Sequence, residues 1–428
     1  MTDRTRLGVA FRTLGCKVNR AESESIAAEL LGVGVALAEE SEAAVVVINT
    51  CTVTGEADAK ARKAVRHALA GPGQPVVVVT GCLAALDRDA LSALGERVVV
   101  EVDKARVPTI VAEILGADAA HGGEHVPGPR AGDSAFRTRV ALKVEDGCNA
   151  FCSYCIVPYA RSVPRAVPLA EVAEQSAGLV AAGTSEIVLT GINIGCYDDL
   201  GHDLADVIEA VAASGVARIR LSSLEPLDLT PRLLARMAST PAFCAHLHVP
   251  LQAGSDPVLS AMGRGYTTEQ FATRLQAARA ALPGLVITTD VLAGFPGETA
   301  EQAAETLAFC ERIGFGKLHV FRYSRRPGTP AAARDDQVAE PEKAARAGAL
   351  RELSVRLSAE HAEARLGDDT EVIVERVNTV AGSPPLAEGT TRDYLHVRFE
   401  AHGVSAGEVA MVRLVAVEGD RVLGSLLD

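Results

Sequence analysis

Three cysteines in one short loop constrain this chain more than any other feature. Alternating apolar residues predict a strand over residues 140–145, and Cys148, Cys152 and Cys155 follow it closely. Three thiolates spaced this tightly can converge on one inorganic centre. A cubane iron–sulfur cluster has four irons and normally takes four cysteine ligands, so three ligands would leave one iron open to a substrate or cofactor. The spacing therefore predicts a reactive centre rather than an electron relay.

Two other interpretations of these cysteines fit less well. A structural zinc site usually takes paired C-x-x-C or Cys/His sets, and no histidine lies between His125 and His202 to act as a nearby fourth ligand. A disulfide is disfavoured because the chain has nine cysteines and its first residues carry no secretion signal. Grouped cysteines in a reducing compartment indicate metal binding or catalysis instead.

The length and composition of the chain set the scale of the fold. With 428 residues, of which 48% are hydrophobic, the chain can form two or three domains with large cores. Its formal net charge of −13 argues against a protein that coats nucleic acid non-specifically, although a local basic patch can still bind it. No apolar run approaches membrane-spanning length, so we expect a cytoplasmic protein without a membrane partner.

The first part of the chain, residues 1–118, alternates strand and helix patterns. Its predicted strands cover 9–13, 44–48 and 76–79. Their valine runs are typical of buried parallel strands in an α/β sandwich. Cys16, Cys51 and Cys82 each follow the carboxyl end of one strand, and such ends share one edge of a parallel sheet. We therefore expect a second three-cysteine centre with an open iron. Three unrelated buried cysteines are the alternative.

The longest part of the chain, residues 135–363, continues the strand–helix alternation. A linker rich in Gly and Pro and without periodicity, 119–134, precedes it. Six strands are predicted, over 140–145, 186–190, 218–222, 246–251, 286–292 and 317–323. Six β/α units in series indicate a curved parallel sheet or a partial (β/α)6 barrel, whose functional edge is the carboxyl ends of the strands.

The loops after these strands carry residues suited to hold a ligand. Glycines in the loops allow the backbone to approach a ligand closely, and Asn193, Glu225 and Gln252 can hydrogen-bond its polar groups. Glycine and proline also punctuate ordinary turns, so each loop alone is weak evidence. Together at one edge, beside the 148–155 loop, they predict a cofactor cradle.

The last part of the chain, residues 364–428, predicts a small β-barrel of the kind that binds oligonucleotides. Its predicted strands cover 370–377, 394–399, 408–417 and 421–426. Between residues 366 and 428 the chain has 11 acidic and 5 basic residues, although an RNA-binding face should be basic. We hypothesise that Arg392, Arg398 and Arg413 cluster on the barrel surface.

The C-x-x-x-C-x-x-C loop, with Tyr154 before its last cysteine, resembles the signature of the radical S-adenosylmethionine (SAM) superfamily. The resemblance implies a four-iron, four-sulfur cluster on Cys148, Cys152 and Cys155, whose open iron chelates SAM. Reduction of such a cluster cleaves SAM to a 5′-deoxyadenosyl radical, while the protein supplies orientation and seclusion. The candidates for SAM contacts are then Tyr154, Asn193, Glu225 and Gln252.

The order of the three parts resembles the methylthiotransferases of this superfamily, which have an N-terminal three-cysteine domain, a radical SAM core and a C-terminal TRAM domain. Residues 14–19, Leu-Gly-Cys-Lys-Val-Asn, and 49–54, Asn-Thr-Cys-Thr-Val-Thr, are similar to the branch that acts on N6-threonylcarbamoyladenosine at position 37 of tRNA. The branch acting on N6-isopentenyladenosine more often reads Tyr-Gly-Cys-Gln-Met-Asn at the first motif. That nucleoside and ribosomal protein S12 are the alternative substrates.

The family resemblance implies a reaction that uses two clusters and two SAM molecules. One SAM would methylate a sulfur on an auxiliary four-iron cluster held by Cys16, Cys51 and Cys82, and the second would give the radical that removes hydrogen from adenine C2. The implied partners are the anticodon loop of tRNA and a reductant such as flavodoxin or ferredoxin. The arginines expected as RNA-binding candidates are Arg161, Arg165, Arg325 and Arg326.

A non-catalytic iron–sulfur protein that relays electrons or senses oxygen is the alternative from another functional class. Such a protein would not consume SAM. A chain with only the loop cluster would hold about four irons rather than about eight. The remaining cysteines, Cys196, Cys244 and Cys310, are interpreted as packing residues.

Overall fold

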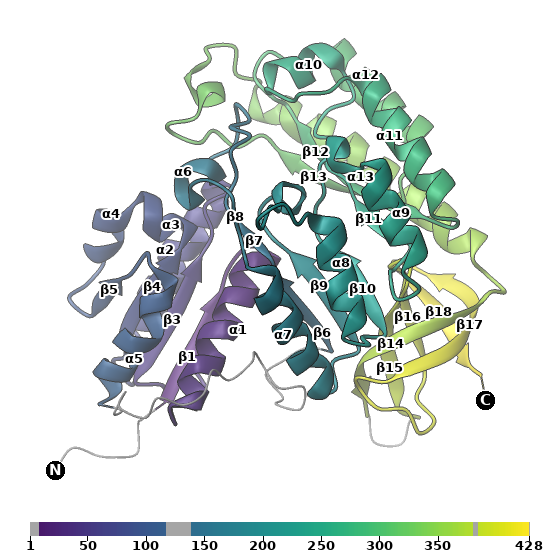
Figure 1. Cartoon of the computed structure of the whole chain (residues 1–428). Coiled ribbons are helices and arrows are strands. Elements are labelled where there is room, and N and C mark those ends of the chain that lie inside the picture. Colours follow the sequence, from purple (N-terminus) through teal and green to yellow (C-terminus); the bar gives the residue numbers. More distant parts are fainter. Residues whose placement is uncertain (1–7, 117–137, 380–383, 428) are drawn as a thin grey trace.

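The computed structural model describes residues 8–116, 138–379 and 384–427, which form three bodies in chain order. An N-terminal parallel sheet, a curved central sheet and a C-terminal barrel follow one another from purple to yellow (Figure 1). This arrangement confirms the predicted fold class, an α/β chain that ends in a small β-barrel. The linker expected at 119–134 lies outside the described residues. No helix in the described part of the chain is long and apolar enough to span a membrane.

The N-terminal sheet has five parallel strands in the order β2-β1-β3-β4-β5. They are β1 (Gly8–Thr13), β2 (Ala36–Leu37), β3 (Val45–Thr50), β4 (Val76–Gly81) and β5 (Val98–Val100). The valine runs bury β3 and β4 on both faces, because successive side chains of a strand point to opposite sides of the sheet. The three predicted strands are confirmed, and β2 and β5 are additional.

Helices cover both faces of this sheet, which makes the predicted sandwich. They are α1 (Lys17–Gly32), α2 (Gly55–Leu69), α3 (Cys82–Leu86), α4 (Arg88–Ser92) and α5 (Val107–Leu115). Ala61 and Val65 of α2 pack with Val46 on one face. Ile26 of α1 and Val111 of α5 pack on the opposite face.

The central sheet has six parallel strands and curves into a partial barrel (Figure 1). They are β6 (Arg139–Lys143), β9 (Glu186–Thr190), β10 (Arg218–Leu221), β11 (His246–His248), β12 (Val286–Ala293) and β13 (Lys317–Arg322). Parallel bridges, Ile219 to Phe243 and Ser223 to His248, join the half made by β6, β9 and β10 to the half made by β11, β12 and β13. The six predicted strands are therefore confirmed.

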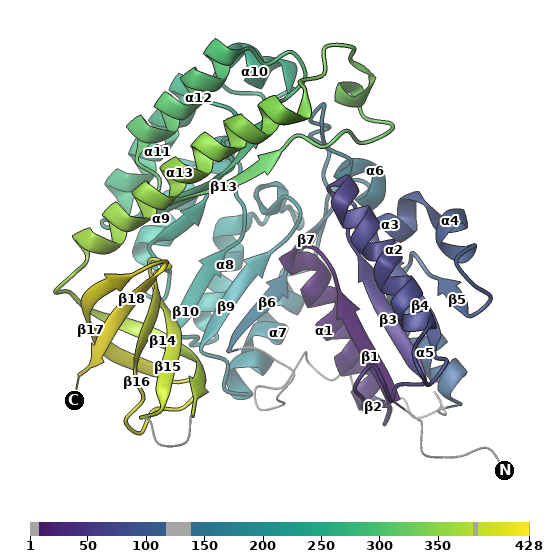
Figure 2. The same ribbon diagram turned by 180° about the vertical axis from the view of Figure 1, so that it is seen from behind.

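Helices pack on the convex side of the central sheet. The helices of this body are α6 (Val157–Arg161), α7 (Leu169–Ala181), α8 (Leu204–Ala213), α9 (Pro231–Ser239), α10 (Asp256–Ala261), α11 (Thr268–Ala281), α12 (Ala300–Ile313) and α13 (Glu340–Ala364). A short antiparallel pair, β7 (Glu145–Asp146) and β8 (Arg165–Ala166), flanks the cysteine loop. Helix α1 of the N-terminal body lies beside β6, at the edge of the central sheet (Figure 2).

The concave face of the central sheet is polar, because alternate residues of each strand point away from the helices. Ile187 and Leu189 of β9 are buried against the convex-side helices. Glu186 on the same strand points to the concave side, where Arg220 Nε donates to its Oε1 at 3.0 Å. Charged groups therefore line the hollow that the partial barrel encloses.

The C-terminal barrel closes in the strand order β14-β15-β16-β18-β17, with β17 paired back to β14. Its strands are β14 (Asp369–Asn378), β15 (Leu386–Thr391), β16 (His396–Glu400), β17 (Val409–Glu418) and β18 (Arg421–Leu426). Val372, Val374, Phe399 and Val412 lie in its interior. The four predicted strands are confirmed. β15 is additional, because its sequence contains a glycine and lacks an alternating apolar pattern.

The barrel packs against the central sheet near β10 (Figure 1). Arg218 Nη1 donates to the Thr390 carbonyl at 3.0 Å, and Arg220 Nη2 donates to the Thr391 carbonyl at 3.2 Å. The ring of Tyr394 stacks on His246 with centroids 4.6 Å apart. The barrel therefore closes one end of the polar hollow.

Candidate active site

The 148–155 loop follows β6 and β7 at the carboxyl edge of the central sheet. Gly147 begins the loop with a φ of +104°, and a Cβ at this position would lie 2.3 Å from the Val163 carbonyl oxygen. Only glycine fits this turn without strain. Ser153 anchors the loop, since its amide donates to the Met262 carbonyl at 2.8 Å. The loop is therefore held in one shape by its backbone.

The three cysteines of this loop differ in exposure: Cys152 is buried, whereas Cys148 and Cys155 are half-buried. Burial raises the pKa of Cys148, and burial together with the neighbouring thiols raises the pKa of Cys155 to about 12. Arg264 Nη1 lies 3.4 Å from Cys152 Sγ. Because the thiolate is the form that binds metal, cationic irons at this loop would supply the charge that three grouped thiolates need.

Buried acceptor atoms near the loop fit an organic cofactor. Glu145 Oε1, Asn193 Oδ1 and Asp228 Oδ2 have no hydrogen-bond partner among the described residues. Burial raises the pKa of Glu145 to about 7 and that of Asp228 to about 6. A Cβ on Gly195 would lie 1.7 Å from Asp228 Oδ2, so this loop passes directly over the carboxyl group. The amino and hydroxyl groups of SAM are hydrogen-bond donors that could pair with such acceptors.

The residues expected to contact SAM lie in different settings. Asn193 carries one of the unpartnered acceptors described above. Glu225 forms an ion pair with Arg264. Tyr154 packs against the core of the central body, and burial raises the pKa of its hydroxyl well above the usual range. Gln252 adopts a left-handed φ of +68° after β11.

The second cysteine set lies at the carboxyl edge of the N-terminal sheet. Cys16 follows β1, and Cys51 and Cys82 follow β3 and β4. Gly15 has a φ of +99°, and a Cβ there would lie 2.9 Å from Cys51 Sγ, so the segment before Cys16 packs on Cys51. Burial raises the pKa of Cys51 and of Cys82, and the neighbouring Cys16 thiol raises both further. Three cysteines distant in sequence therefore meet, with Cys16 exposed and the other two buried.

Both cysteine sets offer three ligands for a cluster. Among the described residues, no group of three or more Cys, His, Asp or Glu side chains is close enough to hold a single metal ion. The ligands of a cubane bind different irons, and they stand farther apart than the ligands of one ion. The three thiols of each set match the number of protein ligands expected for a four-iron cluster with one open iron.

Arg161, at the end of α6, connects the central body to the cysteine site of the N-terminal body. Its Nε donates to Cys82 Sγ at 3.2 Å and its Nη2 donates to Asn19 Oδ1 at 2.5 Å, both in the N-terminal body. Its Nη1 donates to Glu22 Oε1 at 2.7 Å and to Asp146 Oδ1 at 2.9 Å. The prediction that Arg161 contacts RNA is wrong, because its guanidinium is buried and its donors are used within the protein.

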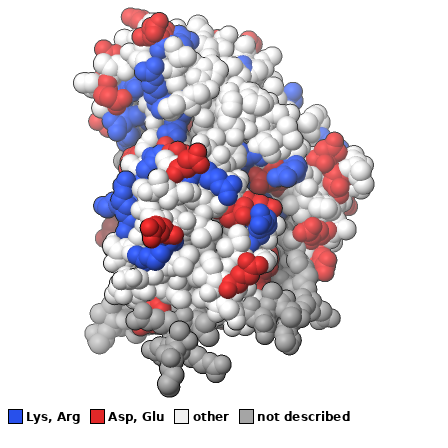
Figure 3. All heavy atoms as spheres, turned by 90° about the vertical axis from the view of Figure 1, so that its left-hand side faces the viewer, with Lys and Arg blue, Asp and Glu red and all other residues white. Residues whose placement is uncertain are grey.

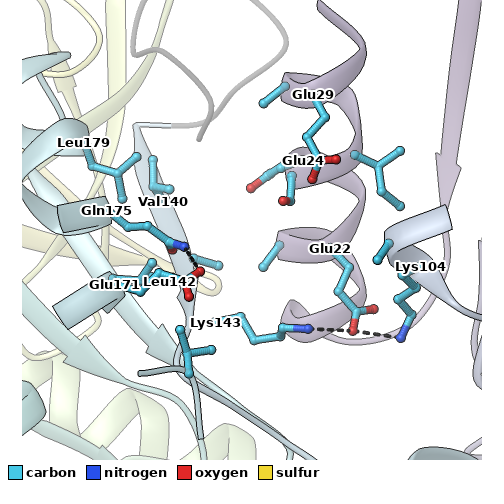
Figure 4. Close-up of a pocket in the computed structure, with 17 residues that line it drawn as sticks. Glu22, Glu24, Glu29, Lys104, Val140, Leu142, Lys143, Glu171, Gln175 and Leu179 are labelled. Carbon is cyan, nitrogen blue, oxygen red and sulfur yellow. Dashed lines mark hydrogen bonds and ion pairs between the residues drawn. The ribbon is translucent and has the colours of Figure 1, made fainter. Parts of the chain in front are cut away.

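Glu22 balances this charge and lines a cavity of about 280 Å³ between α1 and β6 (Figure 4). Burial alone would raise the pKa of Glu22, but Arg161, Lys104 and Lys143 lower it to about 2. The ammonium groups of Lys104 and Lys143 lie 2.8 and 3.4 Å from Glu22 Oε1. Further acidic residues, including Glu171, line the cavity. This lining does not suit an RNA phosphate.

Arg326, after β13, makes a second connection to the N-terminal body. Its Nη2 donates to Thr52 Oγ1 at 2.8 Å and to Asp58 Oδ2 at 2.7 Å. The side chain is buried, so the prediction that it contacts RNA is also wrong. Arg165 and Arg325 are exposed and stay predictions as RNA contacts.

The hypothesised cluster of Arg392, Arg398 and Arg413 on the barrel is wrong. These arginines pair with three different carboxylates, Arg398 with Glu388. A different set gathers around Glu388 instead; it consists of Arg376, Arg398 and Arg421. These three arginines come from β14, β16 and β18, and all of them lie beside one carboxylate on β15.

The outer face of the N-terminal body carries both signs of charge. Lys and Arg side chains are most numerous along one flank of the face seen in Figure 3, with Asp and Glu side chains among them and on the other flank. Helix α2 contributes Lys60, Arg62, Lys63 and Arg66, of which Lys60 and Arg62 form ion pairs. Basic side chains are thus concentrated locally, although the whole chain is acidic.

A pocket of about 470 Å³ opens beside Cys16, where the three bodies meet. Its charged lining residues are Lys17, Arg20, Arg139, Glu375 and Arg376. Tyr394 of the barrel also borders it. Basic side chains therefore outnumber acidic ones in the cavity that adjoins the exposed cysteine.

The remaining cysteines separate into two kinds. Cys244 and Cys310 are fully buried, which confirms their interpretation as packing residues. Cys196 is half-buried and accepts a hydrogen bond from Asn193 Nδ2 at 3.1 Å, so it belongs to the surroundings of the 148–155 loop.

Family models match both cysteine-bearing bodies. The radical SAM superfamily matches residues 142–310, and a model described as Uncharacterized protein family UPF0004 matches residues 8–102. The solved radical SAM methyltransferase TsrM from Kitasatospora setae is 15% identical and aligns with a TM-score of 0.57 over 88% of this chain and 81% of that chain. The fold and the cysteine loop thus define a radical SAM protein, a class that uses SAM and a four-iron cluster.

Curated relatives narrow this class to one family. The threonylcarbamoyladenosine tRNA methylthiotransferase MtaB of Bacillus subtilis is 38% identical over 95% of this chain and 93% of that protein, and its Thermotoga maritima counterpart is 32% identical over 98% and 97%. A tRNA-2-methylthio-N(6)-dimethylallyladenosine synthase of Streptomyces coelicolor is 33% identical over 97% of this chain and 87% of that protein. The chain belongs to the radical SAM tRNA methylthiotransferase family.

Proposed function

We propose that this enzyme adds a methylthio group to C2 of N6-threonylcarbamoyladenosine at position 37 of tRNA. The observation that supports the proposal is that two three-cysteine sets lie in bodies that contact each other: Arg161, six residues after Cys155 in the chain, donates to Cys82 Sγ at 3.2 Å. Sulfur insertion needs a radical source and a sulfur source at one substrate carbon. Relatives named for this nucleoside align over nearly the whole chain at 32–38% identity.

The cysteines divide the cofactor binding between the two bodies. Cys148, Cys152 and Cys155 would hold the cluster that binds SAM, and Cys16, Cys51 and Cys82 would hold an auxiliary four-iron cluster. When bound, these groups supply the radical and methylthio-transfer chemistry. Tyr154, Asn193, Glu225 and Gln252 are the proposed SAM contacts, joined by Glu145 and Asp228. Their buried carboxyl groups would orient SAM through its donors and keep water from the site.

The partners of the proposed reaction are tRNA and an electron donor. Adenosine 37 lies in the single-stranded anticodon loop, so presenting its base costs little unpairing energy. Arg165, Arg325 and the arginines around Glu388 are the proposed phosphate contacts. A flavodoxin or ferredoxin is the proposed reductant, and the cytoplasm, where tRNA is modified, is the proposed location.

The proposed domains follow the three bodies. The N-terminal methylthiotransferase domain covers residues 1–118 and carries the auxiliary site. The radical SAM core covers 135–363 after a linker at 119–134, and a TRAM-like RNA-binding domain covers 364–428.

A second candidate substrate is N6-isopentenyladenosine 37, which needs the same chemistry at C2. It is favoured by relatives named tRNA-2-methylthio-N(6)-dimethylallyladenosine synthase, which are 31–36% identical to this chain. The two candidates differ only in the group on N6, so the substrate pocket must decide between them.

Mass spectrometry of tRNA nucleosides, from cells with and without this gene, tests the proposed function. We expect 2-methylthio-N6-threonylcarbamoyladenosine to disappear in the deletion strain and its precursor to accumulate. Loss of 2-methylthio-N6-isopentenyladenosine instead would keep the chemistry and change the substrate. No change in either nucleoside would direct the search to ribosomal protein S12.

A further inference from the structure

We propose that the pocket beside Cys16 binds the carboxylate of the group carried on N6 of the target adenine, and that Lys17 is the residue that selects it. The inference rests on the proposed function, because it names the part of the substrate that this pocket takes. A threonylcarbamoyl group ends in a carboxylate and a hydroxyl, whereas an isopentenyl group is a neutral hydrocarbon. A pocket that distinguishes them must do so mainly by charge.

The position of the pocket suits this task. Its walls come from the start of α1, the concave side of β6 and β9, and the barrel strand β14 with Tyr394. Cys16 forms part of the wall and is exposed. A base that presents its C2 to this cysteine site has its N6 substituent within reach of the pocket. The volume of about 470 Å³ is sufficient for a substituent of this size.

Two of the other basic side chains that line the pocket, Arg139 and Arg376, form ion pairs with glutamates. Arg139 Nη2 lies 3.0 Å from Glu375 Oε1, which offsets its charge. Arg376 lies 3.5 Å from Glu388. Lys17 is exposed and forms no ion pair with any side chain that the structure describes. Its ammonium group is therefore available to an incoming carboxylate.

His246 stacks on the ring of Tyr394, which borders the pocket, and it experiences the positive charge of Lys17. Burial lowers the pKa of His246 well below its usual range, and Arg220 and Lys17 lower it further. The imidazole of His246 is therefore neutral near pH 7 and adds no positive charge of its own beside the Lys17 ammonium.

The cavity between α1 and β6 does not offer the same chemistry. Glu22, Glu24, Glu29 and Glu171 line it, together with Lys104 and Lys143 (Figure 4). Both lysines contact Glu22, so their charges are directed to a carboxylate that is already present. A second carboxylate would be repelled there. The pocket beside Cys16 is therefore the better site for an anionic substituent.

The test compares three anticodon stem–loop RNAs that differ only at position 37: one with the threonylcarbamoyl acid, one with its methyl ester and one with the isopentenyl group. Binding to the reconstituted full-length enzyme is measured by fluorescence anisotropy, and methylthiolation by mass spectrometry. We expect the acid to bind roughly tenfold more tightly than the ester, because a hydrogen bond to a charged group is lost in the ester. Lys17→Gln should bring this acid-to-ester ratio close to one.

Two further variants show whether the effect belongs to this side chain. Lys17→Arg keeps a cation in the pocket and should retain the preference for the acid. Lys60→Gln removes the same charge from the outer face of α2, where Lys60 pairs with Glu56, and should leave the ratio unchanged. Iron is measured in each preparation because Lys17 follows Cys16 directly. Both RNAs are tested on one preparation, so partial cluster loss changes both methylthiolation rates and not their ratio.

The outcomes separate the inference from the function on which it rests. Equal binding of the acid and the ester by the wild type would overturn the role of the pocket. An unchanged acid-to-ester ratio in Lys17→Gln would also overturn it. In either case, methylthiolation of the threonylcarbamoyl RNA would leave the proposed function intact. Methylthiolation of the isopentenyl RNA alone would overturn the proposed substrate itself.

Discussion

At the scale of single residues, Arg161 has the densest set of contacts in the candidate site. It brings one positive charge to Glu22 and Asp146, which are both largely removed from water, and its Nε reaches Cys82. A buried carboxylate is stable only with a cation or several donors beside it. Arg161 is therefore a positioning residue that holds the edges of two sheets together.

We predict that Arg161→Met destabilises the protein by about 3 kcal/mol, because Glu22 and Asp146 lose the cation they share. Chemical denaturation measures this change. Iron analysis of the reconstituted variant should fall from about eight irons per chain toward about four, because Cys82 loses its neighbour. Arg165→Met, on the exposed strand β8, is the matched control and should equal the wild type in stability and iron content. Wild-type stability and iron content in Arg161→Met would contradict the assignment.

Some residues of the candidate site can be predicted from the sequence, and others cannot. The six cysteines of the candidate site could be found from spacing and from their places after strands. Arg161 and Arg326 could not be assigned, because an arginine in a loop has the same local pattern whether it faces solvent or a carboxylate that is 139 or 268 residues away. Glu145 and Asp228 were missed because burial, which raises their pKa values, depends on tertiary packing.

At the scale of elements, the turn before Cys16 packs closely against Cys51. Gly15 adopts a φ that favours glycine, and the space where a Cβ would stand is filled by Cys51. Gly34 has a comparable φ of +82° but has nothing within 4 Å of the same position. Alanine substitutions at the two positions would both strain the backbone, but only the one at Gly15 would also collide with Cys51.

We predict that Gly15→Ala loses the auxiliary site, whereas Gly34→Ala keeps it. Both substitutions carry a backbone strain of about 1–3 kcal/mol. Only the first pushes the Cys16 segment away from Cys51, so only the first should reduce iron to about four per chain. SAM cleavage to 5′-deoxyadenosine, which depends on the other loop, should continue in both. Equal iron contents in the two variants would show that the contact with Cys51 does not matter.

The secondary structure could be predicted well where apolar runs were long. The strands β3, β4 and β9 stood out because buried parallel strands need continuous apolar residues. The strands β2 and β5 have two and three residues, too few to show a pattern, and β15 contains a glycine. Their pairing depends on neighbouring strands, which a local pattern does not reveal.

At the scale of the whole molecule, the barrel is attached through two arginines of β10. Arg220 is 1% exposed and spans from Glu186 to the carbonyls of Thr391 and Arg392. Arg218 reaches the neighbouring carbonyl. The barrel therefore occupies a fixed place at the end of the polar hollow, where Tyr394 and Glu375 border the pocket beside Cys16.

We predict that Arg220→Met loosens the barrel, because Glu186 loses its closest cation and two barrel carbonyls lose their donor. Limited proteolysis should release the C-terminal barrel at the segment between α13 and β14 several-fold faster than in the wild type. Arg413→Met removes an exposed barrel arginine that pairs only with Asp369 and should digest like the wild type. Equal digestion of the two variants would show that β10 does not hold the barrel.

The exposure of Cys16 also determines where damage by air would begin. Cys51 and Cys82 are buried, so dioxygen or a peroxide reaches this group of thiols first at Cys16, and oxidation of a cysteine to sulfenic acid and beyond follows access to solvent. The same opening leads to the pocket in which we place the substituent of the substrate. An RNA seated there would cover the exposed sulfur, so bound substrate should protect the enzyme against inactivation by oxygen.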